Sequence, residues 1–319
     1  MRKRAVGSTS VELTELSFGA ASLGNLYHET REQDADAAVA AAFEQGIRYF
    51  DTAPHYGLGL SERRLGNALK RYPRDTLVIS SKVGRLLVPN EHPTGRDSDI
   101  FAVPDELRRE WDFSRDGILR SAEASLDRLQ TDYIDILYLH DPDASGDDTA
   151  VRRGAEALIE LREQGVVRAV GIGSNSAEAV TEAFATTDID LAMLAGRYTL
   201  LDHHAADAVF EAARGRAIVA VGVFNSGLLA TPRPAPGANF NYEPASQAVL
   251  ARANALADLC ESHDATLPQA AIAFPLRHES VASVAVGMRS AEQVERNVAL
   301  YSDEPRPELW DALAAAGLI

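Results

Sequence analysis

Short apolar runs alternate along this chain with longer segments whose apolar residues recur at helical spacing. The runs are compact and β-prone, so we expect them to be strands. Strands that alternate with helices predict a parallel sheet, and eight such strands can close into a barrel. The expected strands are residues 16–19, 48–51, 77–82, 134–140, 169–173, 191–195, 218–223 and 282–286.

The fold class expected from this pattern is α/β, a single (β/α)8 TIM barrel domain that spans residues 1–319. With 46% apolar residues a chain of this length can bury one large core. Residues 4–13 alternate loosely around Gly7-Ser8-Thr9 and predict a β-hairpin ahead of the barrel. The expected helices are residues 31–45, 61–71, 114–129, 150–164, 177–186, 205–214, 247–262 with 268–277, and 291–300.

Two connections are too long to be simple links between a strand and a helix. Residues 84–113 are polar and hold three prolines, and residues 226–246 hold four. Both segments follow the carboxyl end of an expected strand. Because long loops inside a compact domain usually serve as lids or binding walls, we expect both to overhang the same mouth of the barrel.

Composition excludes several classes of partner. The formal net charge of −16 argues against nucleic acid and against an anionic membrane, since both need a basic face. The single cysteine, Cys260, fits a reducing compartment, and no signal peptide or membrane-spanning run is evident, so we expect a cytoplasmic protein. The pair His203-His204 has no partner at metal-ligand spacing, so no metal is expected. The sequence gives no indication of an oligomeric state.

Polar side chains stand at the ends of three expected strands. Asp51, Lys82 and His140 each end a strand, and Tyr56 follows the first of these strands by a short loop. Taken singly, each has an ordinary explanation: a helix cap, a surface charge, a satisfied imidazole and a core phenol. Together, at the carboxyl ends of parallel strands, they predict a catalytic site.

Three segments of the chain resemble the aldo-keto reductase family. The first runs from Gly46 through Asp51-Thr52-Ala53 to Tyr56-Gly57 and is followed by Ser61-Glu62 and Leu65-Gly66. The other two are residues 119–140, ending in Leu139-His140, and residues 165–175, ending in Gly173-Ser174-Asn175. The resemblance extends from about Leu13 to Asn297, and within the family it is to the sugar-oxidising branch.

The resemblance implies that Asp51, Tyr56, Lys82 and His140 are a catalytic tetrad that serves hydride transfer. Taking a hydride from a carbinol carbon also requires removal of the hydroxyl proton, so one acid/base must contact the substrate oxygen. A phenol such as Tyr56 can take this part if the Lys82 ammonium stabilises its phenolate, which we expect to bring its pKa close to working pH. Asp51 would keep Lys82 charged, and a neutral His140 would hydrogen-bond the substrate oxygen.

Hydride transfer implies a nicotinamide cofactor, NADP or NAD. A Rossmann fingerprint is not evident, because Gly171-Ile172-Gly173-Ser174 lacks the third glycine. The resemblance implies instead that Ser174 and Asn175 bind the nicotinamide carboxamide. It further implies contacts from Tyr198 and from the loop that contains Phe224, Asn225, Ser226, Gly227 and Leu228, although 195–198 and 221–228 depart from the pattern of many relatives.

Near the C-terminus, Gly287, Arg289, Gln293 and Asn297 resemble the family's adenosine-phosphate site. A helix that opens near Ala291 offers its N-terminus to an anion. Arg289 would grip a 2′-phosphate, which favours NADP slightly, but a solvated arginine at a helix start is nearly as good an explanation.

The substrate-side candidates are His55, Trp111 and Asp141. The resemblance to the sugar-oxidising branch implies an NAD(P)-dependent oxidoreductase that oxidises an aldose at C1 to a lactone, and a polar mouth with an aspartate suits such a polyol. A general aldehyde or ketone reductase and a pyridoxal dehydrogenase are the alternatives among enzymes. A dinucleotide-sensing regulatory subunit with little turnover is the alternative of another class.

Overall fold

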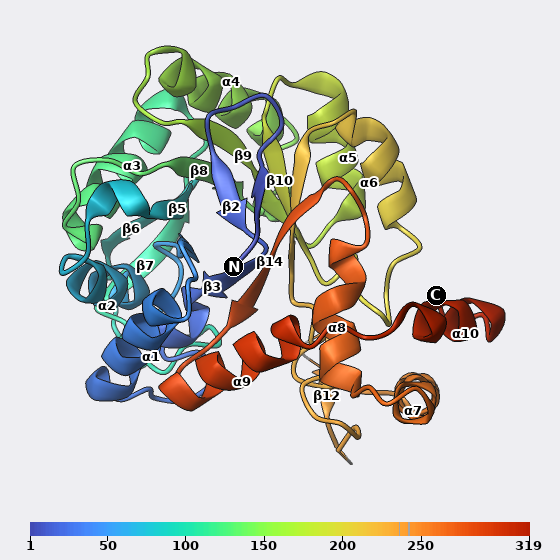
Figure 1. Cartoon of the computed structure of the whole chain (residues 1–319). Helices are drawn as coiled ribbons and strands as arrows, with labels where there is room; N and C mark the ends of the chain where they lie inside the picture. Colours follow the sequence, from blue (N-terminus) through green and yellow to red (C-terminus); the bar gives the residue numbers. More distant parts are fainter. Residues whose placement is uncertain (236, 242) are drawn as a thin grey trace.

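The computed structural model describes residues 1–235, 237–241 and 243–319, so Pro236 and Tyr242 of the expected 226–246 connection lie outside it. Eight parallel strands form a closed barrel in the order β10-β11-β14-β3-β4-β5-β8-β9, which confirms the expected fold class (Figure 1). Their bounds are β3 Leu16–Gly19, β4 Tyr49–Asp51, β5 Val78–Val83, β8 Ile136–His140, β9 Ala169–Ser174, β10 Leu191–Ala195, β11 Ala217–Val221 and β14 Val281–Gly287.

Helices surround this barrel, and local capping explains where several of them begin. Ser114, Ser176 and Ser290 each accept a backbone N–H of the first turn that follows, and Thr266 forms a capping box with Gln269. The helices are α1 Glu32–Glu44, α2 Leu60–Leu69, α3 Arg115–Leu129, α4 Ala150–Glu163, α5 Ala177–Thr186, α6 Ala206–Ala213, α7 Gln247–Ser262, α8 Leu267–Leu276, α9 Ala291–Ser302 and α10 Pro307–Ala315.

Helix α10 is absent from the sequence prediction. It starts at Pro307, a favourable first helical position, and buries Leu309, Trp310 and Leu313 against a second core that α7 and α8 share. Figure 1 shows α7 and α10 on the same side of the barrel, outside α8.

The N-terminal hairpin pairs β1 Lys3–Ala5 with β2 Glu12–Thr14. Val6, Val11 and Leu13 are fully buried and pack with inward-facing residues of the barrel strands, so the hairpin plugs one end of the barrel. This leaves the end at which the strands terminate open for a site.

The expected loop 84–113 contains a second hairpin that the sequence analysis missed, β6 Arg85–Pro89 paired with β7 Leu107–Trp111. Its tip is held in place, because Arg109 forms a two-bond ion pair with Asp97 at 2.7 Å and Phe101 bridges to Leu26. The segment is therefore a wall built on strands. The later connection likewise carries short strands, β12 Asn239–Phe240 and β13 Glu243–Pro244.

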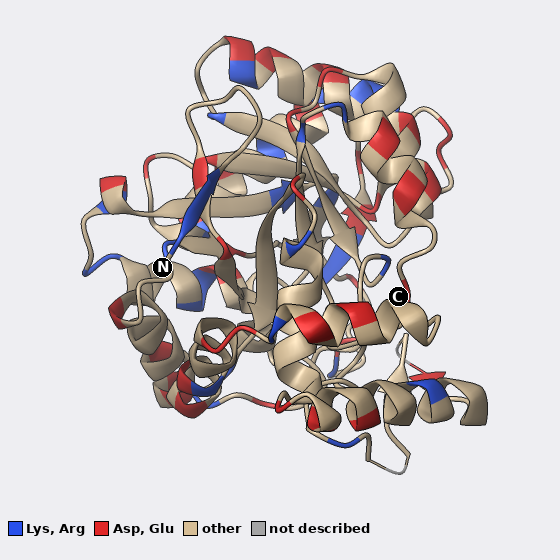
Figure 2. Ribbon diagram, turned by 45° about the vertical axis from the view of Figure 1, so that its right-hand side comes forward, with Lys and Arg blue, Asp and Glu red and all other residues tan. Residues whose placement is uncertain are grey.

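Charged residues lie mainly along the outer helices and connecting loops of the ribbon, with acidic and basic positions interspersed, while the barrel strands carry few (Figure 2). Within the described ranges no helix is long and apolar enough to cross a membrane.

Candidate active site

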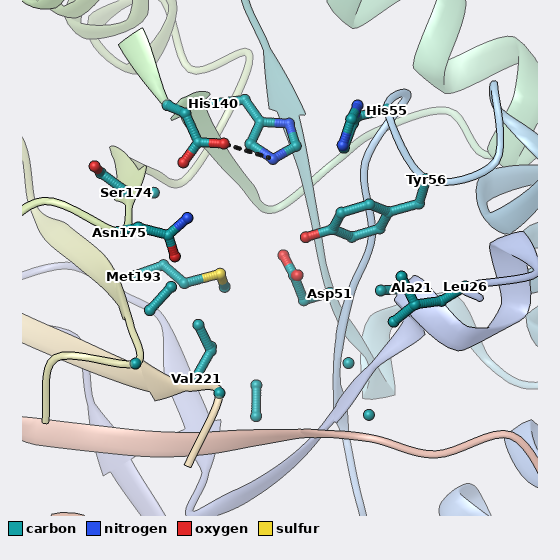
Figure 3. A pocket seen from close by; sticks show the side chains of 18 of the residues that line it. Ala21, Leu26, Asp51, His55, Tyr56, His140, Ser174, Asn175, Met193 and Val221 are labelled. Atoms are coloured by element: carbon teal, nitrogen blue, oxygen red, sulfur yellow. Dashed lines mark ion pairs between the residues drawn. The ribbon is translucent and has the colours of Figure 1, made fainter. Parts of the chain in front are cut away.

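Four polar residues meet at the open end of the barrel. Asp51 ends β4, Lys82 is the fifth residue of β5, His140 ends β8, and Tyr56 lies in the turn after β4. Barrel closure places β4, β5 and β8 side by side, with Asp51 opposite Ser80 and Lys82 opposite Tyr138. All four line one cavity of about 620 Å³, and Figure 3 shows the Tyr56 hydroxyl directed toward the space between Asp51 and His140.

Lys82 is almost fully buried and is held by Asp51. Its Nζ donates to Asp51 Oδ2 at 2.7 Å and to the carbonyl oxygen of Thr52 at 3.0 Å. Burial is the largest single influence and by itself would lower the pKa of Lys82, but the charge and hydrogen bond of Asp51 and the interaction with Tyr56 together outweigh it, so the pKa is raised above its ordinary value. Lys82 therefore stays an ammonium inside the barrel.

Tyr56 lies against this ammonium, with Lys82 Nζ 4.7 Å from the centre of its ring. Burial raises the pKa of Tyr56, and the positive charge of Lys82 offsets only part of that rise. The expectation that Lys82 brings the phenol close to working pH is therefore wrong for the protein by itself. The tyrosine is a protonated phenol before any other charge enters the cavity.

His140 is a neutral imidazole. Its ring meets the Tyr56 ring edge-on at 5.7 Å. Burial, together with the charges of Arg85 and Lys82, holds the pKa of His140 well below its usual range. Its Nδ1 is buried and has no hydrogen-bond partner among the described residues, whereas its Nε2 lies 3.6 Å from Asp141 Oδ2 (Figure 3).

His55 and Asp141 lie beside the tetrad and line the same cavity. The His55 ring meets His140 edge-on at 5.3 Å, and burial lowers the pKa of His55 to about 2. Burial raises the pKa of Asp141, although the charge of Arg85 opposes the rise. Asp141 has a left-handed backbone with a φ of 44°, which turns the chain sharply after β8.

Arg85 connects these groups and is missing from the sequence prediction. Its guanidinium forms an ion pair with Asp141, approaches His55 Nδ1 at 3.3 Å and lies over the Trp111 ring at 4.3 Å. Trp111 itself is 40% exposed and does not line the cavity, so its expected substrate contact is replaced by support of Arg85 from behind. The signal for Arg85 in the sequence is only its place three residues after Lys82.

The expected cofactor residues divide into two groups. The first group lines the cavity: Ser174, Asn175, Asn225, Ser226 and Gly287. Arg197, which the prediction omitted, lines it as well. The others do not line this cavity: Tyr198, Phe224, Gly227, Leu228, Arg289, Gln293 and Asn297.

Tyr198 corrects the prediction. Its ring packs at 4.7 Å against Phe210 of α6 and at 5.2 Å against Phe274 of α8, which makes it part of the core between these helices. A tyrosine held there is not positioned to stack on a ring in the cavity. Leu228 is likewise a buried core residue, and Phe224 packs on the same cores.

Beyond Gly287 the chain leaves the cavity lining and leads to the start of α9. Arg289 contacts His28 and donates to the carbonyl oxygen of Leu26 at 3.2 Å, and its backbone N–H donates to Gln293 Oε1 at 3.0 Å. In the part of the chain that the structure describes, Arg289 forms no ion pair with a carboxylate. Asn297 is buried one turn further along α9.

The Aldo/keto reductase family model matches residues 15–316. The chain belongs to the aldo-keto reductase family. It is 46% identical over 320 residues to a protein from a Pseudomonas species named D-threo-aldose 1-dehydrogenase, covering 99% of this chain and 97% of that one. It is 40% identical over 338 residues to pyridoxal 4-dehydrogenase of Microbacterium luteolum, covering 99% and 98%.

Among solved structures, the holo form of an aldo-keto reductase from Bacillus halodurans matches with a TM-score of 0.75 at 30% identity, over 97% of this chain and 93% of that one. A glycerol dehydrogenase from Gluconobacter oxydans, at 21% identity and a TM-score of 0.79 over 98% and 94%, shares the fold. The protein is therefore an NAD(P)-dependent oxidoreductase with the barrel of its family.

A dinucleotide fits the described site. Asn225 is buried at the cavity wall, and both polar atoms of its amide lack a partner among the described residues. Asn297 Oδ1, in the middle of α9 and outside the cavity lining, is another buried amide atom without a partner within the described ranges. Orphaned buried amides of this kind are costly unless a ligand satisfies them. No group of three or more potential metal-binding residues occurs in the part of the chain described.

Proposed function

We propose that this reductase-family protein oxidises the C1 hydroxyl of a cyclic aldose to a lactone. In this reaction a hydride leaves C1 and a proton leaves the C1 hydroxyl, so that an aldose and NAD(P)+ give a lactone, NAD(P)H and H+. When bound, the nicotinamide supplies the hydride acceptor, and its oxidised ring brings a positive charge that adds to that of Lys82. The name of the Pseudomonas relative supports this choice of substrate.

Tyr56 is the proposed proton carrier, because it is a phenol at the open end of the barrel with an ammonium against its ring. Lys82 provides the counter-charge for the phenolate, and the ion pair with Asp51 keeps that charge in place. The neutral His140 imidazole lines the cavity edge-on to Tyr56, with its Nε2 3.6 Å from Asp141 Oδ2, which suits it to orient the substrate oxygen.

The observation that carries the choice of a sugar is the ion pair between Arg85 and Asp141. Both line the cavity beside His55 and His140, and as a pair they carry no net charge. An arginine and a carboxylate side by side present donors and acceptors at fixed positions, which matches the neighbouring hydroxyls of an uncharged polyol. A simple apolar aldehyde would make no hydrogen bonds to the remaining donor and acceptor positions of this pair, which the hydroxyls of a sugar could fill.

A substrate panel tests the proposal. Production of reduced nicotinamide is followed by absorbance with aldopyranoses, pyridoxal and simple alcohols, and reduction of small aldehydes is followed in reverse. Aldopyranoses are expected to give the highest kcat/KM and to yield a lactone. Arg85→Met is expected to lower kcat/KM for these sugars by ten-fold or more while changing that for small aldehydes little.

Other outcomes would overturn the assignment. Faster turnover of pyridoxal, or of simple aldehydes, would select one of the alternative reductase or dehydrogenase activities. Tight cofactor binding without turnover of any compound would select a dinucleotide-sensing subunit. Tyr56→Phe is expected to abolish turnover with unchanged dinucleotide affinity, and activity above a few per cent in that variant would exclude Tyr56 as proton carrier.

For the cofactor we propose a preference for NADP. Arg289 lies before the N-terminus of α9 and forms no described ion pair with a carboxylate, so its guanidinium is available for a 2′-phosphate. Arg289→Leu is expected to weaken NADP binding by about ten-fold or more and to leave NAD binding unchanged. Equal affinity of the unaltered protein for both dinucleotides would refute this role.

A further inference from the structure

Three hydroxyl groups lie in the barrel interior beneath the tetrad. Tyr49, Ser80 and Tyr138 are fully buried and come from β4, β5 and β8. Their oxygens form a continuous chain. Tyr138 OH is 3.0 Å from Tyr49 OH, Tyr49 OH is 3.0 Å from Ser80 Oγ, and Ser80 Oγ donates to Asp51 Oδ1 at 2.7 Å.

The direction of every hydrogen bond in this chain is determined by its last member. The Asp51 carboxylate can only accept, so Ser80 must donate to it. Ser80 has a single proton, so Tyr49 must donate to Ser80, and by the same argument Tyr138 must donate to Tyr49. Burial raises the pKa of both tyrosines, so neither loses its proton near neutral pH.

The two oxygens of Asp51 therefore have separate tasks. Oδ2 accepts from Lys82 at 2.7 Å, and Oδ1 accepts from Ser80 at the same distance. Aligned hydroxyls in a medium of low dielectric polarise one another, which strengthens the bond that reaches the carboxylate. Two charge-assisted hydrogen bonds, one to each oxygen, hold the carboxylate with Oδ2 directed at Lys82.

We propose that Ser80, with Tyr49 and Tyr138 behind it, is a positioning group that keeps Asp51 ionised and directs its second oxygen to Lys82. This role rests on the proposed part of Lys82 as counter-charge to Tyr56. Without the Ser80 donor, proton transfer from Lys82 to Asp51 becomes easier, because the anion loses one of its hydrogen bonds. Lys82 would then hold its proton less firmly, and the Tyr56 phenolate would lose part of its stabilisation.

The neighbouring residue supplies a matched control. Ser81 is adjacent on β5, is also fully buried, and donates a hydrogen bond of the same 2.7 Å length to a carboxylate. Its acceptor is Glu62 of α2, outside the barrel, and Glu62 also accepts a hydrogen bond from Arg128. Ser80→Ala and Ser81→Ala therefore remove the same hydroxyl from opposite faces of one strand.

The test uses the small number of lysines. The chain holds only Lys3, Lys70 and Lys82, and the first two are exposed. Lysine labelled with ¹³C at Cε gives one resonance for each, and Lys82→Met assigns the buried one. The protonation of Lys82 can thus be followed by NMR in the full-length protein without substrate, so the result does not depend on which sugar is oxidised.

In the unaltered protein, Lys82 is expected to stay protonated through the pH at which Lys3 and Lys70 titrate. In Ser80→Ala it is expected to titrate about one pH unit lower than in the unaltered protein, the effect of losing one hydrogen bond to a charged group. The kcat for oxidation should fall about ten-fold with little change in KM. In Ser81→Ala the Lys82 resonance should titrate as in the unaltered protein.

The proposal is overturned if Ser80→Ala leaves the Lys82 titration unmoved, or if Ser81→Ala moves it equally. Should Ser80→Ala fail to fold, Tyr49→Phe decides, since it leaves Ser80 in place but removes the donor behind it. Tyr49→Phe must then lower the titration of Lys82 by a smaller amount, and an unchanged titration refutes the chain. Failure of the proposed sugar oxidation would appear separately, as absent turnover in the unaltered protein.

Discussion

The counter-charge role of Lys82 leads to a prediction whose size follows from the geometry. Lys82 Nζ lies 4.7 Å from the centre of the Tyr56 ring. At an effective dielectric constant of about 20, a unit charge at this distance stabilises a phenolate by roughly 3.5 kcal/mol. Replacing Lys82 by Met removes that stabilisation. We therefore expect sugar oxidation at fixed pH to slow by two to three orders of magnitude.

The assay is single-turnover formation of reduced nicotinamide across a pH series, with the sugar that turns over fastest. Oxidation needs the phenolate, so the rate should rise with pH and the whole profile of Lys82→Met should move to higher pH. Because this variant leaves the buried carboxylate of Asp51 unpaired, the double variant Asp51→Asn/Lys82→Met is the control. It should recover part of the loss. A profile unmoved in pH, with a rate within ten-fold of normal, would refute the reasoning.

Two further predictions concern stability. His55 and His140 have depressed pKa values in the folded protein, so below about pH 6.5 the unfolded chain binds protons that the native state refuses. The contribution of the two neutral imidazoles to the free energy of unfolding is thus complete above that pH. It is lost as pH falls, by roughly 2–3 kcal/mol per pH unit for the two together. Urea unfolding at pH 7 and pH 5 measures this loss of unfolding free energy, and His55→Gln should halve it. An unfolding free energy that changes equally with pH in both proteins would count against neutral buried imidazoles. Separately, a Cβ at Gly66 would lie 2.1 Å from the carbonyl oxygen of Leu129, so Gly66→Ala should cost about 3 kcal/mol or more in denaturant unfolding. The exposed neighbour Asn67→Ala on the same helix should cost less than about 0.5 kcal/mol, and equal losses would show that close packing of α2 on α3 is not the cause.

The order of strands and helices was predictable because it depends on local pattern. Apolar runs of strand length and helical periodicity are properties of neighbouring residues. The starts of three helices each depend on a single N-cap residue, Ser114, Ser176 or Ser290. Helix α10 was not predicted because the Pro307–Ala315 segment is stabilised by packing on α7 and α8, which a local pattern does not show. The β6–β7 hairpin was not predicted because a long tip separates its two strands in the sequence. Contacts between distant residues, such as Arg109 with Asp97, hold that tip in place.

Within the site, residues at strand ends were within reach of sequence reasoning, and side-chain direction was not. Tyr198 and Trp111 both follow polar segments near strand ends, yet one packs between α6 and α8 and the other lies behind Arg85. Arg85 was missing from the sequence prediction because its partner, Asp141, is far away in the chain. The same holds for the contact between Ser80 and Asp51.

By itself, then, the sequence determined that Asp51, Lys82 and His140 stand at or next to the carboxyl ends of strands and that a parallel sheet would carry these groups at one edge. Only the tertiary structure decided which of their atoms meet. Closure of the barrel sets β4, β5 and β8 in register, and that register aims one oxygen of Asp51 at Lys82 and the other at a buried hydroxyl. Register and side-chain direction depend on contacts between residues remote in the chain, which no local pattern encodes.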